Sequence, residues 1–149
     1  MTYNPVDPFQ TGADGKRRLP SFSLAERDRR YARVRNLMRE HNLDCLLAPA
    51  ADNGEPQANS RYLCQMGGVQ GGAWVVFPAS GDVTAILSSE RELRMWAANL
   101  FWPSDIRWGD FSKLVPDRLH ELGFAKSRIG ITGLREMVGQ LAERAWRIA

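Results

Sequence analysis

Segments with helical spacing alternate with short apolar runs along this chain, and that alternation constrains its fold more than any other feature. The first segment opens with a capping box, in which the Ser23 hydroxyl and the Glu26 carboxylate can each accept from a free backbone N–H. A helix is predicted over residues 24–41. Its apolar positions are Leu24, Tyr31, Val34 and Met38. The next run, residues 44–48, is short, apolar and stopped by Pro49, which is typical of a buried strand.

Two β-prone runs follow in the middle of the chain. They cover residues 73–77 and 83–87, and the turn-forming stretch 78–82 between them predicts a hairpin. Residues 59–65 fit either a short helical turn or a strand, and the sequence leaves both possibilities open.

The second half repeats the alternation. A second helix is predicted from Ser89 to just before Pro103. The apolar face of this helix consists of Leu93, Trp96, Ala97, Leu100 and Phe101. Pro116 leaves the start of a third helix open, and Gly123 marks its end. The remaining predicted elements are a strand over 105–108, that third helix within 112–122, a strand over 128–131 and a helix over 134–148.

These elements together predict an α/β fold. Helices that alternate with strands cover both faces of one sheet, which gives a three-layer α/β/α arrangement, and the hairpin makes that sheet mixed. Residues 1–22, which contain Pro5, Pro8 and Pro20, are expected to form an extended N-terminal arm. Residues 23–149 are expected to form a single domain.

Charge and composition exclude several classes of protein. The net charge of +3 comes from residues 1–41, which hold 9 basic and 5 acidic side chains, against 11 and 12 in residues 42–149. No basic stripe with interleaved aromatic residues is present, so nucleic-acid binding is not expected. The longest apolar run, residues 73–77, is too short to cross a membrane, and the first 20 residues do not resemble an export signal. Two cysteines, Cys45 and Cys64, fit a reducing compartment, and we expect a cytoplasmic protein.

Catalytic patterns are missing from the sequence. His41 and His120 lack a second ligand at helical spacing, so we expect no metal site and no cofactor in this chain. The glycine-rich stretch 67–72 does not match a phosphate-binding loop, and no nucleophile motif occurs. We therefore expect no catalytic residue here.

Five segments together resemble the N-terminal domain of the creatinase/prolidase family. The first is the helix that begins Phe22-Ser23-Leu24-Ala25-Glu26-Arg27, and the second is Leu43-Asp44-Cys45-Leu46-Leu47. The third, Asn59-Ser60-Arg61-Tyr62-Leu63, is similar to a family stretch that reads N-x-R-Y-L-T, although Cys64 stands where threonine is common. The last two are the hairpin around residues 74–84 and the strand Arg128-Ile129-Gly130-Ile131.

The resemblance implies the family's mixed sheet with a ribonuclease H-like motif. It also implies the non-catalytic N-terminal domain of a Xaa-Pro dipeptidase or aminopeptidase, which aids formation of a homodimer and covers an active site. The family's catalytic domain holds a divalent metal pair with two Asp, one His and two Glu, and none of these ligands maps onto this chain. That C-terminal domain would be a partner of this one. The alternative is a stand-alone α/β domain that binds a small ligand or another protein.

Three residues are candidates for the rim of a substrate site: Asn59, Arg61 and Tyr62. Family members use the small domain of one subunit to touch substrate held by the other, and an arginine can pair bidentately with the carboxylate of a peptide. The alternative is structural, with Arg61 capping a local carbonyl and Tyr62 packing in the core. Self-association is expected from Trp102 and Trp108, which lie near the ends of elements where they could remain exposed.

Overall fold

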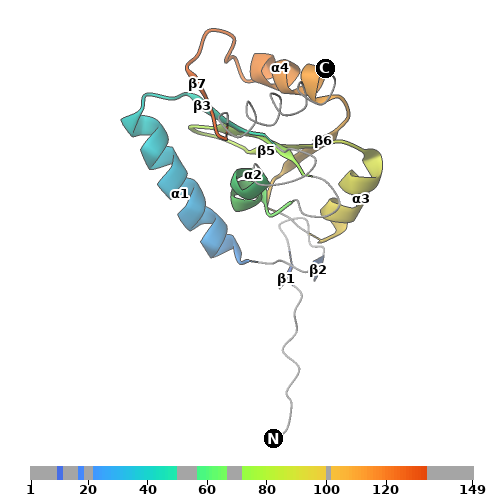
Figure 1. Ribbon diagram of the computed structural model, residues 1–149. Helices are drawn as coiled ribbons and strands as arrows, with labels where there is room; N and C mark the ends of the chain where they lie inside the picture. The colour runs from blue at the N-terminus through green and yellow to red at the C-terminus, as the bar shows by residue number, and fades with distance from the viewer. Residues whose placement is uncertain are drawn as a thin grey trace, which may run out of the picture.

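A mixed five-stranded β-sheet lies at the centre of the computed structural model (Figure 1), which describes residues 10–11, 17–18, 22–49, 57–66, 72–99 and 102–133. Across the sheet the strand order is β6-β5-β4-β3-β7. Antiparallel pairing joins β3 to β4 and β4 to β5, whereas β6 pairs with β5 and β7 with β3 in parallel. The predicted mixed sheet is confirmed. Its strands are β3 (Cys45–Ala48), β4 (Trp74–Pro78), β5 (Thr84–Leu87), β6 (Asp105–Trp108) and β7 (Ile129–Ile131).

Helices cover both faces of this sheet. Figure 1 shows α4 on one side and α1, α2 and α3 on the other, so the three-layer arrangement is also confirmed. The helices are α1 (Leu24–Glu40), α2 (Gln57–Cys64), α3 (Glu90–Asn99) and α4 (Phe111–Glu121). No helix among the described residues is long and apolar enough to cross a membrane.

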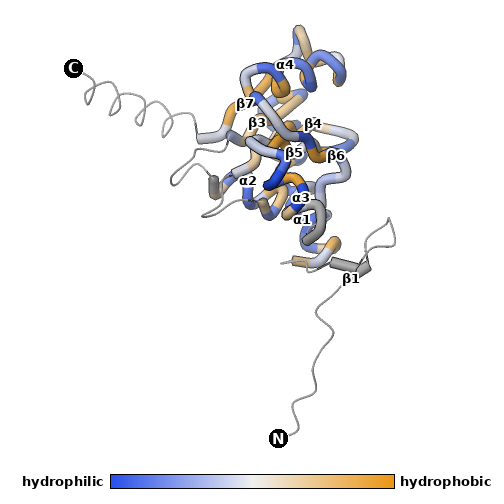
Figure 2. Tube along the Cα trace, turned by 90° about the vertical axis from the view of Figure 1, so that its right-hand side faces the viewer, coloured by the Kyte–Doolittle hydropathy of each residue, from blue (hydrophilic) through white to orange (hydrophobic). Residues whose placement is uncertain are grey.

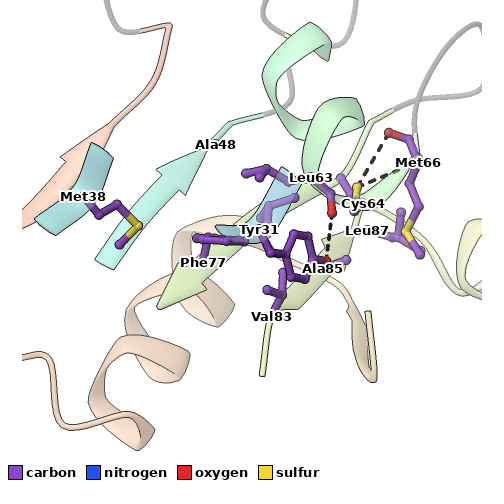
Figure 3. Close-up of a cluster of buried hydrophobic side chains, with 12 residues drawn as sticks. Tyr31, Met38, Ala48, Leu63, Cys64, Met66, Phe77, Val83, Ala85 and Leu87 are labelled. Atoms are coloured by element: carbon purple, nitrogen blue, oxygen red, sulfur yellow. Dashed lines mark hydrogen bonds between the residues drawn. The ribbon is translucent and has the colours of Figure 1, made fainter. Parts of the chain in front are cut away.

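The larger part of the core lies between the sheet and α1, α2 and α3 (Figure 3). The ring of Tyr31 packs edge-on against that of Phe77, with 5.0 Å between the centroids. Its hydroxyl donates a hydrogen bond of 2.9 Å to the backbone carbonyl of Leu63 in α2. Tyr31 therefore ties α1 both to the sheet and to α2.

The opposite face is covered by α4, whose turns alternate between hydrophilic and hydrophobic residues in Figure 2. Val115 of α4 is buried, in a cluster with Cys45, Leu47, Val76 and Ile86 of the sheet. Asp110 caps the helix by accepting from the Ser112 N–H at 2.9 Å. This cap places the start of α4 at Phe111, so that Pro116 lies inside the helix and not at its beginning.

Most predicted elements lie where the sequence places them, and residues 59–65, which the sequence leaves open, are mostly helical. Ser23 caps α1 as expected, but the Glu26 carboxylate accepts from Arg29 and Arg30. Two short strands, β1 (Gln10–Thr11) and β2 (Arg17–Arg18), pair antiparallel within the segment predicted to be an extended arm. The helix predicted over 134–148 lies outside the described residues.

The two tryptophans invoked for self-association differ in exposure. Trp102 is only 3% exposed, so the expectation that it stays at the surface is wrong. It packs instead near Tyr31, with 6.4 Å between the ring centroids. Trp108 is 48% exposed, on the edge strand β6.

Candidate functional site

Helix α2 carries all three predicted site residues. Its inner side is buried against the sheet through Ser60, Leu63 and Cys64, which fixes the helix in place. Asn59 and Arg61 are exposed on its outer side.

The structure brings two of the three candidates together. Arg61 and Tyr62 share a recess of about 310 Å³, called here the α2 recess, which is lined by Phe22, Arg30, Ala58, Arg61, Tyr62 and Gln65. Asn59 lies on the other side of Tyr62, in a second and larger hollow of about 570 Å³ against α1. Tyr62 borders both hollows and separates Asn59 from Arg61.

A buried arginine forms part of the wall of the α2 recess. Arg30 is only 9% exposed, and its Nε donates a hydrogen bond of 2.8 Å to Glu26. Its guanidinium carbon lies 4.4 Å from the ring centroid of Phe22 and 4.6 Å from that of Tyr62. Hydrogen bonds from Arg29 and Arg30 lower the pKa of Glu26 to about 2. The charge of Arg30 is thus already paired inside the protein.

Arg61 is placed differently. Its backbone carbonyl accepts from the N–H of Gln65 at 2.9 Å, as part of the helical pattern. No described residue forms a hydrogen bond or ion pair with its guanidinium, which is exposed at the recess. Arg61 could therefore bind an anion without losing a partner among the described residues.

Gln65 is the most unusual residue of the recess. It directly follows the last residue of α2. Its backbone φ is +64°, in the left-handed region that residues other than glycine rarely adopt. The residue is only 9% exposed, and neither polar atom of its amide has a hydrogen-bond partner within the described part of the chain.

Sequence reasoning missed Arg30 and Gln65. Arg30 lies four residues before Val34, at the edge of the apolar stripe of α1, and this spacing could have indicated its burial. The sequence gives no comparable signal for the backbone conformation of Gln65.

The cysteines do not favour nucleophilic chemistry. Burial raises the pKa of the Cys64 thiol to about 12 and that of Cys45 to about 11, so both are protonated at neutral pH. Within the described residues, no group of three or more His, Cys, Asp and Glu side chains could hold a metal ion.

Comparison with known proteins identifies similar domains. The family model described as the creatinase/prolidase N-terminal domain matches residues 30–143. Among solved structures, a Xaa-Pro aminopeptidase from Streptococcus pyogenes is similar, with a TM-score of 0.55 and 18% identity over 73% of this chain and 75% of that chain. The dipeptidase PepE from Mycobacterium ulcerans gives a TM-score of 0.39 and 18% identity over 76% of this chain and 24% of that chain. No curated protein matches the sequence.

Proposed function

The chain belongs to the creatinase/prolidase N-terminal domain family, and from this premise we propose that it is the non-catalytic N-terminal domain of a metal-dependent Xaa-Pro peptidase or a related hydrolase. In this role it aids formation of a homodimer and covers the active site of a C-terminal catalytic domain, which supplies the divalent metal pair. The observation that carries the proposal is the family match over residues 30–143. The fold shared with a Xaa-Pro aminopeptidase supports it.

The α2 recess is the part of the domain that we propose to reach the substrate. The exposed guanidinium of Arg61 offers a planar pair of donors to the terminal carboxylate of a peptide. Tyr62 provides an aromatic wall beside Arg61. Arg30 fixes Tyr62 by a hydrogen bond to its backbone carbonyl and by a contact between its guanidinium and the ring. Asn59 contributes to the rim on the far side of Tyr62, where it can donate and accept hydrogen bonds.

Kinetics of the whole enzyme test this role. The domain is expressed with the coding sequence that follows Ala149, and Arg61→Ala is compared with Arg91→Ala, an exposed arginine on α3. Loss of a charged hydrogen bond of about 1.5–3 kcal/mol should lower kcat/KM by about tenfold or more for Arg61→Ala alone. Equal values of kcat/KM for the two variants would show that Arg61 does not contact the substrate. A stop codon after Ala149 would favour the stand-alone binding domain instead.

The proposed homodimer needs its own test. Trp108 supports it, because this large side chain is 48% exposed on the edge strand β6. Trp108→Arg should weaken self-association in sedimentation equilibrium, whereas Lys113→Ala on the surface of α4 should not. A monomeric parent protein at high concentration would contradict the proposal.

A further inference from the structure

We propose that the α2 recess recognises a carboxylate together with a secondary amide next to it, with Arg61 as the partner of the carboxylate and Gln65 as the partner of the amide. This chemistry occurs in an N-acylated amino acid and at the C-terminal end of a peptide whose last residue is not proline, because proline forms a tertiary amide without an N–H. Within the proposed function it therefore fits a longer substrate of the form Xaa-Pro-Yaa and not an Xaa-Pro dipeptide. The inference rests on the proposed function, because it assigns a second contact within the same site.

The backbone of Gln65 is the first observation. Among described residues other than glycine, only Asn42 and Gln65 have a positive φ, at 53° and 64°. Asparagine adopts this region with little strain, but glutamine does not share that tolerance. Glycine would be the unstrained choice at position 65, so the presence of a long polar side chain there calls for an explanation.

The amide of Gln65 is the second observation. Its Nε2 and Oε1 are withdrawn from water, and neither has a partner in the described ranges. Buried polar groups in native proteins are almost always paired, so an amide with both polar atoms unpaired calls for an explanation. A ligand that supplied both missing hydrogen bonds would remove this cost.

The chemistry of the recess defines what such a ligand must carry. A primary amide offers N–H donors and a carbonyl acceptor, which are complementary to the carbonyl and the N–H of a secondary amide. Because both polar atoms of Gln65 are buried in this structure, they meet such a ligand only after the side chain adopts another rotamer, and its flexible torsions provide that movement. Arg61 lines the same recess and leaves its charge available for a carboxylate.

The neighbouring side chains favour this assignment over a simple anion site. Phe22 and Tyr62 provide aromatic surface, whereas the charge of Arg30 is held by Glu26. A small inorganic anion would satisfy Arg61 but leave the carbonyl oxygen of Gln65 without a donor. A volume of about 310 Å³ also exceeds what a carboxylate alone would fill.

The test uses the 149-residue chain and follows the side-chain N–H signals of Gln65 and Arg61 by NMR during titration. The probes are N-acetylglycine, propionate, which lacks the amide, and N-acetylsarcosine, which lacks only the amide N–H. We expect N-acetylglycine to bind about tenfold more tightly than propionate and several-fold more tightly than N-acetylsarcosine. The affinity for triglycine, compared with that for N-acetylglycine, then shows whether the recess prefers a peptide end or an N-acylated amino acid.

Variants at two positions assign the contacts. Gln65→Met should reduce the affinity for N-acetylglycine to that for propionate, and Gln65→Gly, which relieves the backbone strain, should do the same if Gln65→Met does not fold. Arg61→Ala should weaken all three probes, whereas Arg91→Ala should change none.

The outcomes separate this inference from the proposed function. Equal affinities for N-acetylglycine and propionate, with both dependent on Arg61, would overturn the role of Gln65 and leave the carboxylate contact standing. Binding that does not depend on Arg61, or no binding of any probe, would overturn both.

Discussion

The Nη1 atom of Arg30 donates a hydrogen bond of 3.1 Å to the backbone carbonyl of Tyr62, and its guanidinium also lies over the Tyr62 ring. These residues are 32 positions apart, so the contact fixes α2 against α1. The same arginine is held by Glu26. The wall of the α2 recess is therefore held in place on the side of Tyr62, whereas the guanidinium of Arg61 has no partner among the described residues.

Replacement of this buried cation should destabilise the domain. Arg30→Met keeps much of the side-chain volume but removes the charged hydrogen bonds and the contacts with the aromatic rings. We expect a loss of about 2–4 kcal/mol in the free energy of unfolding. Urea unfolding measures this loss, with the exposed Arg29→Met as the control. A loss as small as that of the control would show that Arg30 does not hold α2 in place.

Replacement of Gln65 by glycine should have the opposite effect on stability. Gln65→Gly removes a strained backbone conformation and an unpaired buried amide, and these gains are offset in part by the greater freedom of glycine in the unfolded chain. We expect the free energy of unfolding to rise by about 1–2 kcal/mol. Asn42→Gly is the matched control, because that residue is exposed with a similar φ, and it should change stability little. A clear destabilisation by Gln65→Gly would mean that the chain itself satisfies the amide.

Acid should destabilise the fold through two glutamates. Hydrogen bonds from Arg29 and Arg30 lower the pKa of Glu26 to about 2, and those from Arg107 and Arg118 do the same for Glu121. Between about pH 2 and pH 4.5, both carboxylates are therefore charged in the folded protein, whereas the same side chains are mostly protonated in the unfolded chain.

Their contribution to stability is therefore present above pH about 4.5 and is lost as the pH falls toward about 2. Chemical unfolding between these values should show the decline, and the double variant Glu26→Gln/Glu121→Gln should flatten it. The exposed Glu40→Gln should retain it. An unchanged slope in the double variant would contradict this assignment.

Much of the fold could be predicted because local patterns and packing agree. The stripe from Leu24 to Met38 defines α1, and the apolar runs around Val76 and Ile86 define the hairpin, with Gly81 at a φ of +89° in its turn. Residues 59–65 could not be assigned, because seven residues of mixed polarity show neither a clear helical period nor a clear alternation. Their helical form depends on contacts with distant residues such as Tyr31, which binds the carbonyl of Leu63.

The candidate site was only partly predictable for the same reason. The residue types of Arg61 and Tyr62 indicate a possible contact, but their shared recess depends on how α2 packs against Phe22 and Arg30. The strain at Gln65 arises where the chain leaves α2, and glutamine carries no sequence signal for a positive φ. The burial of Trp102 was missed because its place beside Tyr31 is fixed by tertiary contacts alone.

The most direct test of the central claim compares two substrates in one enzyme. The substrates are a proline-containing peptide with a free terminal carboxylate and the same peptide with a terminal amide, each assayed with the parent enzyme and with Arg61→Ala. If Arg61 binds the carboxylate, the substitution lowers kcat/KM about tenfold or more for the free acid and less than about twofold for the amide. An equal decrease for both peptides would show that Arg61 does not contact the carboxylate.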